Sequence, residues 1–324
     1  AEEKGYGRKA MRYRIRDWLV SRQRYWGAPV PMIHCPACGI VPDRDLPVTL
    51  PDMESYEPDE TGRSPLARAD SWVRTKCPDC GGDALRDTNT MAGFACSSWY
   101  FLRFASPKYA DGPFDPEAVR YWLPVDLYVG GAEHAVMHLL YARFWTKVMY
   151  DAGMVDFQEP FRVLLNQGML LGADHQKMSK SRGNVVTPDD MVQKYGVDAL
   201  RLYILFMGPF EAELEWSEEG IAGTYRFLRR VWNIVVETQA APLLPRDADF
   251  EKDLKYQLAR TVRKVTQDID TFQFNTGVAA MMEFVNFLAA NREEAGTCLQ
   301  VWREALRDLL VMMAPMTPFI SEEL

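Results

Sequence analysis

A short run of cationic and hydroxyl side chains, Lys177-Met178-Ser179-Lys180-Ser181, could bind phosphate groups. Lysine carries a compact charge on a flexible stem, and serine hydroxyls are small donors, so the run combines charge with hydrogen bonding. Gly172 and Gly183, on either side, allow such a segment to bend. A solvated basic turn before a helix is the alternative, which a five-residue match does not exclude.

Four of the six cysteines lie in two Cys-Pro-x-Cys-Gly turns. Two thiolates on each tight turn can reach one metal ion, and two such turns complete the tetrahedral sulfur shell that suits structural Zn²⁺. Disulfides are the alternative, but nothing else in the sequence indicates an oxidising compartment. The pattern predicts a structural zinc site, with no open position for catalysis, on Cys35, Cys38, Cys77 and Cys80.

Two histidines, His134 and His138, are four residues apart, which would place them on one face of a helix. Metal binding is one interpretation of this spacing, but no carboxylate follows in the usual metalloprotease order and no third ligand is apparent. A pair of satisfied core histidines is the alternative. The pair lies in a segment, 133–151, that has helical periodicity.

The elements around these residues predict a βαβ unit with a parallel pair of strands. A short strand at 126–129 leads to a turn at Gly130-Gly131, then to the helix at 133–151 and a second strand at 161–165. Free backbone N–H groups gather where a strand, a glycine turn and a helix N-terminus meet, which suits a nucleotide. Behind the lysine run, Pro188 opens a helix with Thr187 as its N-cap.

From about Ser217 onward the sequence predicts a helical bundle. Apolar residues recur at helical spacing in two sets, Phe227, Val231, Ile234 and Val235, and Trp302, Leu306, Leu309, Leu310 and Met313. We expect a polar linker at 247–253 between the first helix and the next. The cations of the following helix, Lys255, Arg260, Arg263 and Lys264, could form a solvated face.

Composition narrows the class of protein. A chain of 324 residues with 48% apolar and 25% charged residues is long enough for two or three domains. No apolar run approaches the roughly 20 residues that cross a bilayer. The net charge of −8 argues against a generally cationic nucleic-acid binder, yet residues 1–25 carry eight Lys and Arg against three acidic residues. Arginines alternate with other residues at 12–16, which predicts a strand with arginines on one face. That face could contact RNA, or it could be the solvated edge of a sheet.

Taken together, the motifs resemble those of class I aminoacyl-tRNA synthetases, in which Lys177–Ser181 would be the signature loop that holds the triphosphate of ATP. The stretches Asp17–Pro31, Ser97–Arg103 and Gly130–Phe144 are similar to the bacterial leucyl-tRNA synthetases. Isoleucyl and valyl relatives usually carry Asp-Gln where this chain has Glu133-His134. The resemblance covers almost the whole chain.

The resemblance implies an α/β fold class: a partial Rossmann-like parallel-sheet catalytic core with a zinc-ribbon insertion and a C-terminal α-helical bundle. We expect the catalytic core at 1–34 and 86–210, the ribbon at 35–85, and a truncated bundle of the anticodon-binding type at 211–324. The basic helix would then lie along the tRNA stem.

The implied activity is that of an ATP-dependent leucine-tRNA ligase, which forms leucyl-adenylate and transfers leucine to tRNA(Leu). Lys177 and Lys180 would stabilise charge on the leaving diphosphate, with ATP, its Mg²⁺ and structural Zn²⁺ as cofactors. Other residues implied in ATP binding are Met178, Ser179, Ser181, Gly130, Gly131 and Glu133. The implied pocket for L-leucine consists of Ser98, Phe101, His134 and His138, and the guides for the tRNA acceptor end are Arg22 and Arg24.

The family's His-Ile-Gly-His signature does not occur in this sequence, and no editing-type domain precedes Arg22. We therefore expect an internal piece of a longer, monomeric, cytoplasmic enzyme without membrane segments, and we expect the piece alone to be inactive. Two alternatives stay open: a fragment of a valyl- or isoleucyl-tRNA synthetase, and a non-catalytic zinc-ribbon RNA-binding protein.

Overall fold

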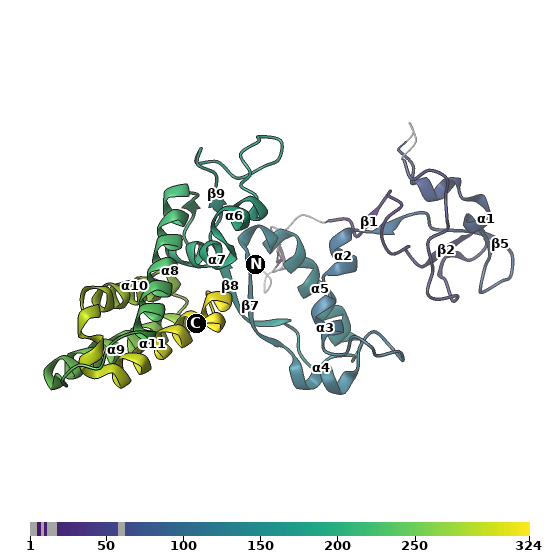
Figure 1. Cartoon of the computed structure of the whole chain (residues 1–324). Helices are drawn as coiled ribbons and strands as arrows, with labels where there is room; N and C mark the ends of the chain where they lie inside the picture. The colour runs from purple at the N-terminus through teal and green to yellow at the C-terminus, as the bar shows by residue number, and fades with distance from the viewer. Residues whose placement is uncertain (1–4, 8–9, 12–17, 58–61) are drawn as a thin grey trace. The chain divides into compact units, whose positions relative to one another are not determined.

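The computed structural model describes residues 5–7, 10–11, 18–57 and 62–324 (Figure 1). The chain divides into two compact units, Ala1–Tyr128 with Glu133–Leu164, and Val129–Ala132 with Leu165–Leu324. We call them unit 1 and unit 2. The strand expected at 12–16 lies outside the described residues. Among the described helices, none combines the length and the apolar character that a membrane span requires.

Unit 1 contains a small four-stranded antiparallel sheet with strand order β3-β2-β5-β4. Its strands are β2 (Met32–Cys35), β3 (Gly39–Pro42), β4 (Arg74–Lys76) and β5 (Asp83–Arg86). Two short helical segments, η1 (Pro65–Arg68) and α1 (Asp70–Val73), lie between β3 and β4 in the sequence. The buried core of this sheet contains Ile33, Cys35, Val41, Cys77 and Ala84. Two of the predicted metal ligands are therefore part of a very small apolar core.

The remainder of unit 1 is mainly helical. A two-residue antiparallel pair, β1 (Ser21–Arg22) with β6 (Thr90–Met91), leads into it. The helices are α2 (Gly93–Ser97), α3 (Tyr100–Phe104), α4 (Pro116–Trp122) and α5 (His138–Asp151), with the 3₁₀ segment η2 (Ala132–Val136) before α5. Phe101 and Leu102 of α3 form one buried cluster with Val119 of α4 and Ala142 of α5. This cluster holds α3 in place, and α3 carries one of the predicted pocket residues.

Strands β7 (Val125–Gly131) and β8 (Phe161–Gln167) pair with each other, and the last three residues of each belong to unit 2. Both strands are longer than predicted. Gly130 and Gly131 end β7 instead of forming a turn after it, which corrects the sequence prediction. The predicted continuous helix at 133–151 is also wrong, because Met137 leaves helical geometry at φ −122° and ψ −106°. The tighter turn of η2 makes the step from strand to helix instead.

After the ends of β7 and β8, unit 2 contains a short parallel pair, β9 (Leu170–Leu171) with β10 (Leu214–Glu215). Helices α6 (Pro188–Tyr195) and α7 (Val197–Phe206) lie between these strands in the sequence. Thr187 is the N-cap residue of α6, as predicted, but its hydroxyl bonds to the Asp190 carboxylate and not to a backbone N–H group.

A helical bundle makes up the rest of unit 2, as predicted. It consists of α8 (Glu218–Gln239), α9 (Ala248–Asp270), α10 (Phe274–Ala290), η3 (Arg292–Cys298), α11 (Leu299–Met313) and α12 (Pro318–Glu323) (Figure 1). The predicted apolar residues of α8 and α11 are buried in one cluster, except for half-buried Leu310. Trp302, fully buried, donates its indole N–H to Thr238 Oγ1 at 3.0 Å, so its one polar atom is satisfied.

The polar linker expected at 247–253 is wrong in position, because α9 already begins at Ala248. Asp247 is its N-cap and accepts hydrogen bonds from the N–H groups of Asp249 and Phe250, each at 3.0 Å. Acidic residues are favourable in the first turn, where backbone N–H groups lack helical partners. The same charges that suggested a linker therefore start the helix.

Candidate functional site

The predicted phosphate-binding segment follows β9 in unit 2. After Leu171 the chain makes a tight turn, in which Gly172 N–H donates to the Gln176 carbonyl at 2.9 Å. Lys177 then bridges back to Leu171 in antiparallel fashion. Beside the turn, His175 Nδ1 lies 2.5 Å from Glu215 Oε1 on β10. The segment is thus anchored to the short sheet of unit 2 at its first residue.

Within the segment, apolar and cationic side chains separate. Met178 is half-buried and packs on the cluster that contains Met191, Tyr203 and Trp216. Lys177 and Lys180 are exposed, and neither forms an ion pair with any residue that the structure describes. Two ammonium groups without a described acidic partner give this anchored loop a local positive charge.

The hydroxyls of this segment lie together. Ser179 Oγ and Ser181 Oγ are 2.7 Å apart, and the N–H groups of Arg182 and Gly183 both donate to the Ser179 carbonyl. The chain therefore turns directly after Lys180, which leaves that side chain at the tip of a turn. Hydroxyls paired in this way can exchange their mutual hydrogen bond for one to a ligand oxygen.

The tandem glycines end β7 and belong to the same unit as this segment. With the Gln167 amide oriented to satisfy both groups, it donates to the Gly130 carbonyl at 3.0 Å and accepts from the Gly131 N–H at 3.2 Å. Gln167 is the last residue of β8, so the two strand ends are fastened by one side chain. Glu133, the third residue expected on the nucleotide side, is exposed in η2 and belongs to unit 1.

The four residues expected to bind an amino acid all lie in unit 1. Ser98 is fully buried and Phe101 is 7% exposed. Ser98 Oγ and His134 Nδ1 are buried atoms without a hydrogen-bond partner among the described residues. The rings of His134 and His138 lie close, at 6.2 Å between centroids, although they do not share one regular helix. Polar atoms held unpaired in apolar surroundings are costly unless a ligand satisfies them.

A chain of three polar groups runs through this part of unit 1. Tyr100 OH lies 2.6 Å from Tyr128 OH, and Tyr128 OH lies 2.7 Å from His138 Nε2. Burial, and secondarily the charge of His134, lowers the pKa of His138 below its usual value. Burial also raises the pKa of Tyr128 strongly, followed in importance by its contacts with Tyr100. The dyad of neutral phenol and neutral imidazole therefore persists at pH 7, and Tyr128 can donate to Nε2.

Arg22 is the last residue of β1 and Arg24 follows two residues later, both in unit 1. Arg22 Nη1 donates to the Ser21 carbonyl at 2.9 Å and to the Leu19 carbonyl, which holds the guanidinium against its own backbone. The Arg24 carbonyl accepts from Thr90 Oγ1 at 2.9 Å, while its side chain is exposed. Their roles toward RNA stay predictions.

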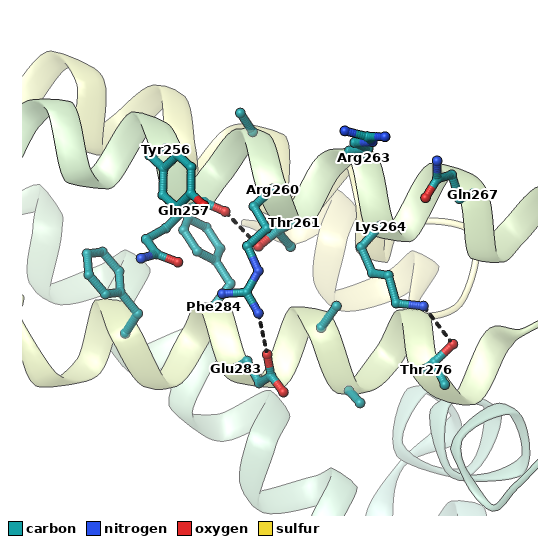
Figure 2. Close-up of a pocket in the computed structure, with 14 residues that line it drawn as sticks. Tyr256, Gln257, Arg260, Thr261, Arg263, Lys264, Gln267, Thr276, Glu283 and Phe284 are labelled. Carbon is teal, nitrogen blue, oxygen red and sulfur yellow. Dashed lines mark hydrogen bonds and ion pairs between the residues drawn. The ribbon is translucent and has the colours of Figure 1, made fainter.

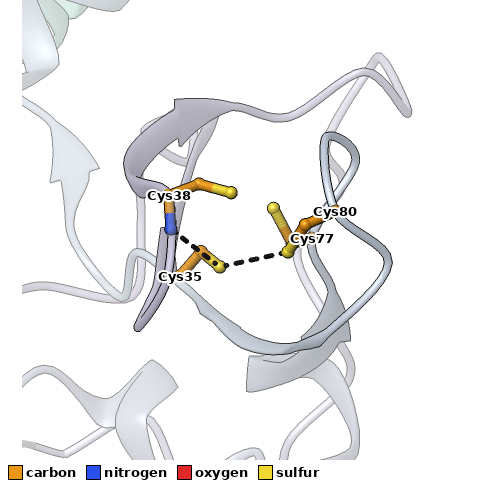
Figure 3. A group of neighbouring side chains, drawn as sticks. All are labelled: Cys35, Cys38, Cys77 and Cys80. Carbon is orange, nitrogen blue, oxygen red and sulfur yellow. Dashed lines mark hydrogen bonds between the residues drawn. The ribbon is translucent and has the colours of Figure 1, made fainter.

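The four cysteines of the predicted metal site come together (Figure 3). All four sulfur atoms lie within 4.8 Å of one another, and Cys35 Sγ is 3.6 Å from Cys80 Sγ. A tetrahedral zinc site with Zn–S bonds of about 2.3 Å has sulfur–sulfur edges of about 3.8 Å, which this arrangement fits. Gly39 (φ +81°) and Gly81 (φ +73°) supply the left-handed residue that closes each turn.

Electrostatics of the cluster favour a cation. Backbone N–H groups, first that of Cys38 and then that of Ala37, lower the pKa of Cys35 to about 7. Contact with the sulfur of Cys80, and then burial, raises the pKa of Cys38 to about 12. The Cys35 thiolate therefore forms readily while the Cys38 thiol keeps its proton, a conflict that a divalent metal ion would relieve.

Helices α9 and α10 border a groove of about 860 Å³ in unit 2 (Figure 2). It is lined by part of the predicted basic face. Arg260 reaches across to Glu283 at 3.7 Å, and Lys264 pairs with Asp268 at 2.6 Å. Lys255 pairs with Glu251. Three of the four predicted cations are therefore engaged within the bundle, which reduces the positive charge that this face offers to RNA.

Sequence reasoning missed several residues that the structure brings to these sites. Sequence patterns do not reveal these residues, because each forms its hydrogen bonds with a residue distant in the sequence or across a turn that periodicity does not predict. Tyr100, which follows Trp99, and Tyr128, two residues before Gly130, could have been found from their place beside named motifs. The missed residues are Tyr100, Tyr128, Gln167, Asp174 and Asn184.

Comparison with family models gives two matches. Residues 3–217 match the model described as tRNA synthetases class I (I, L, M and V). Residues 251–324 match the anticodon-binding domain of tRNA ligase. Together they confirm the predicted fold class of a class I synthetase.

Curated relatives and solved structures agree. A leucine–tRNA ligase of Dehalococcoides mccartyi is 52% identical over 99% of this chain and 39% of its own length. A leucine–tRNA ligase of Thermotoga maritima is 48% identical, over 99% of this chain and 40% of its own length. The chain thus spans about two fifths of the length of these curated relatives. A ternary complex of Agrobacterium radiobacter K84 LeuRS with tRNA and LeuAMS superimposes with a TM-score of 0.88 at 40% identity, over 99% of this chain and 42% of that chain.

A more distant structure shares the fold alone. Mycobacterium tuberculosis methionyl-tRNA synthetase in complex with methionyl-adenylate superimposes with a TM-score of 0.57 at 20% identity, covering 76% of this chain and 51% of that chain. The resemblance to leucyl-tRNA synthetases that the motifs indicated is confirmed by the identity of about one half over the whole chain.

Proposed function

We propose that this chain, which belongs to the family of class I tRNA synthetases (I, L, M and V), is part of an ATP-dependent leucine-tRNA ligase. The observation that carries the proposal is the 52% identity to a leucine–tRNA ligase over 99% of the chain. The family model itself covers four amino-acid specificities, so leucine rests on the relatives. The 324-residue chain alone would not catalyse the reaction.

Activation joins the leucine carboxylate to the α-phosphate of ATP and expels diphosphate. The protein's part is to position the reactants and to neutralise charge that moves onto the leaving group. We assign that neutralisation to Lys177 and Lys180, with Lys180 first. The support is their exposure and their lack of anionic partners among the described residues.

Supporting groups would complete nucleotide binding. Ser179 and Ser181 have hydroxyls that can turn to phosphate oxygens, and Met178 fastens the segment to its core. The backbone of Gly130 and Gly131, and the carboxylate of Glu133, would contact the rest of ATP. Mg²⁺ would be held chiefly by the phosphates, as is usual for this ion.

Leucine would be recognised in unit 1. Phe101 would supply apolar surface, while Ser98 and the two histidines would satisfy polar groups of the amino acid. The unpaired atoms Ser98 Oγ and His134 Nδ1 support this assignment. The neutral His138, fixed by Tyr128, presents a polar ring without a net charge.

The remaining partners follow from the family. tRNA(Leu) would be contacted by Arg22 and Arg24 at its acceptor end and by the bundle that matches the anticodon-binding model. Zn²⁺ on the four cysteines would stabilise the small sheet and take no part in the reaction. A monomeric, cytoplasmic whole enzyme remains part of the proposal.

Leucine-dependent ATP–diphosphate exchange by the whole protein that contains this chain tests the proposal. We expect exchange with leucine to exceed that with valine by about ten-fold or more, because one methylene in an apolar pocket is worth about 10- to 200-fold. Isoleucine and methionine serve as the other comparison substrates.

Two results would contradict the proposal. Exchange that prefers valine or isoleucine would assign the chain to another specificity of the same family. A pure, folded protein that binds RNA but supports no amino-acid-dependent exchange would favour the non-catalytic alternative.

A further inference from the structure

Two side chains close the base of the lysine-bearing segment in unit 2. The Asp174 carboxylate accepts from Asn184 Nδ2, at 3.0 Å to each of its oxygens. Asp174 Oδ1 also accepts from the Gln176 N–H at 3.2 Å. Consistent with these contacts, the pKa of Asp174 is lowered, and the hydrogen bond from Asn184 is the largest cause of this shift. We call this pair of residues the Asp174–Asn184 clasp.

Asn184 also fixes the backbone on both sides of Met178. Its Oδ1 accepts from the Ser179 N–H at 2.8 Å, and its Nδ2 lies 3.4 Å from the Lys177 carbonyl oxygen. Because the side chain of Met178 is packed on the core cluster, the backbone here is held from two directions. The side chains of Lys177 and Lys180 remain free on either side of this fixed point.

Gly172 leaves room for the clasp. A Cβ atom at this position would lie 2.7 Å from Asp174 Oδ1 and 3.2 Å from Asn184 Nδ2. The first distance is shorter than real Cβ contacts allow, so any larger residue would displace the carboxylate. The glycine, the acid and the amide thus form one local arrangement.

We propose that Asp174 and Asn184 are positioning residues, whose clasp fixes the backbone of Lys177–Ser181 and so places both ammonium groups for nucleotide phosphates. This inference rests on the proposed function for its consequence in catalysis. The clasp itself does not contact the nucleotide; it acts through the segment that does. Neither residue belongs to the pattern of lysines and serines that marks the segment.

Limited tryptic digestion tests the clasp without requiring activity. Trypsin can cut after Lys177, Lys180 and Arg182, and mass spectrometry reports each cut. We expect Asn184→Asp to accelerate these cuts by about ten-fold or more. The change removes the hydrogen bond to the Asp174 carboxylate and places a second carboxylate beside it, so the two repel. Asp174→Asn should have a smaller effect, since two amides can still pair.

The exchanged pair, Asp174→Asn with Asn184→Asp, provides the rescue. Asn at 174 can donate to Asp at 184 and accept from Gln176 N–H, while Asp at 184 still accepts from Ser179 N–H. We expect the double variant to return the cutting rate to within about three-fold of wild type, which is the coupling expected of residues in contact. Asp189→Asn, the same change on exposed α6, should leave the rate unchanged and serves as control.

Exchange kinetics of the whole protein test the consequence. Asn184→Asp should lower kcat and raise the KM for ATP, while the KM for leucine stays unchanged; the double variant should recover both. A merely structural defect would lower the active fraction without changing either KM. Equal tryptic cutting of wild type and Asn184→Asp would overturn the clasp. Faster cutting with wild-type kinetics would overturn its role in positioning.

The proposed function fails separately from this inference. If the wild-type protein shows no leucine-dependent exchange, the proposed function is overturned, and digestion of the single and double variants still decides whether the clasp exists. If wild type exchanges normally and the double variant stays as defective as Asn184→Asp, the clasp is overturned while the proposed function stands.

Discussion

Lys177 and Lys180 differ from many other cations of the chain because no described acidic side chain neutralises them. Five other lysines form ion pairs, namely Lys76, Lys147, Lys194, Lys255 and Lys264. An ion pair between two exposed side chains is worth little to stability, so leaving the exposed Lys177 and Lys180 unpaired costs the fold almost nothing. Their charge is instead available to a bound anion, which is the chemical basis of the proposed ATP site.

His138 provides a prediction at the same scale. Its folded-state pKa is lowered by burial and then by His134, so it should titrate below the usual value of about 6.5. Because the folded pKa lies below the unfolded one, the stability it contributes is present above pH 6.5 and is lost as pH falls through the folded pKa. Ring NMR titration of the four histidines, assigned with single variants, measures this directly.

A matched variant separates the two causes. His134→Gln removes the neighbouring charge but leaves the burial, so the pKa of His138 should rise while staying below 6.5. His138→Asn should flatten the loss of unfolding free energy between pH 7.5 and 5.5 in urea denaturation. A His138 that titrates at or above 6.5 in the folded chain would contradict the buried, neutral imidazole.

Among the elements, the four-stranded sheet of unit 1 is the one that we expect to depend on the proposed metal. Its buried core has only five residues, and Cys35 and Cys77 are two of them. So small a core does not offset the conformational entropy of ordering the strands by itself. Metal binding supplies folding free energy in such cases, because the unfolded chain lacks the assembled ligands.

We expect the chain to bind one Zn²⁺, measured by elemental analysis and by chelator competition. Removal of the metal should abolish protection from hydrogen exchange across residues 32–86 and leave the helical bundle protected. Cys80→Ser should have the same effect as chelation. Cys96→Ser, a change outside the cluster, should retain the metal. Full protection of residues 32–86 in a metal-free chain would show that the sheet does not need the ion.

At the scale of elements, the sequence predicted best those features that depend on interactions between residues close together in the chain. Cys-x-x-Cys turns and the 3.6-residue period of α8 and α11 are local signals: the four cysteines do come together and the helices bury the expected residues, while the metal ion stays a prediction. The start of α9 was misplaced because an acidic run favours both a linker and a helix N-terminus. The break at Met137 was missed because periodicity does not report a change from 3₁₀ to α geometry.

For the whole molecule, the family was predictable because its motifs are short and spread along the chain. Contacts such as Tyr100–Tyr128–His138 and Asp174–Asn184 were not, because they depend on how separate segments pack. Predicted domain boundaries at 34, 85 and 210 remain predictions. The chain forms two compact units and spans about two fifths of the length of its curated relatives. Activity should therefore be measured on the whole protein that contains it.

Single-turnover formation of leucyl-adenylate by the whole protein, at saturating ATP and leucine, tests most directly whether Lys180 neutralises the leaving diphosphate. We predict that Lys180→Ala lowers the rate by about 10²- to 10³-fold, the cost of losing one group that stabilises developing charge. Lys252→Ala, which removes an exposed lysine of α9, should leave the rate unchanged. Adenylate formation by Lys180→Ala at the wild-type rate would contradict the proposed role of the segment.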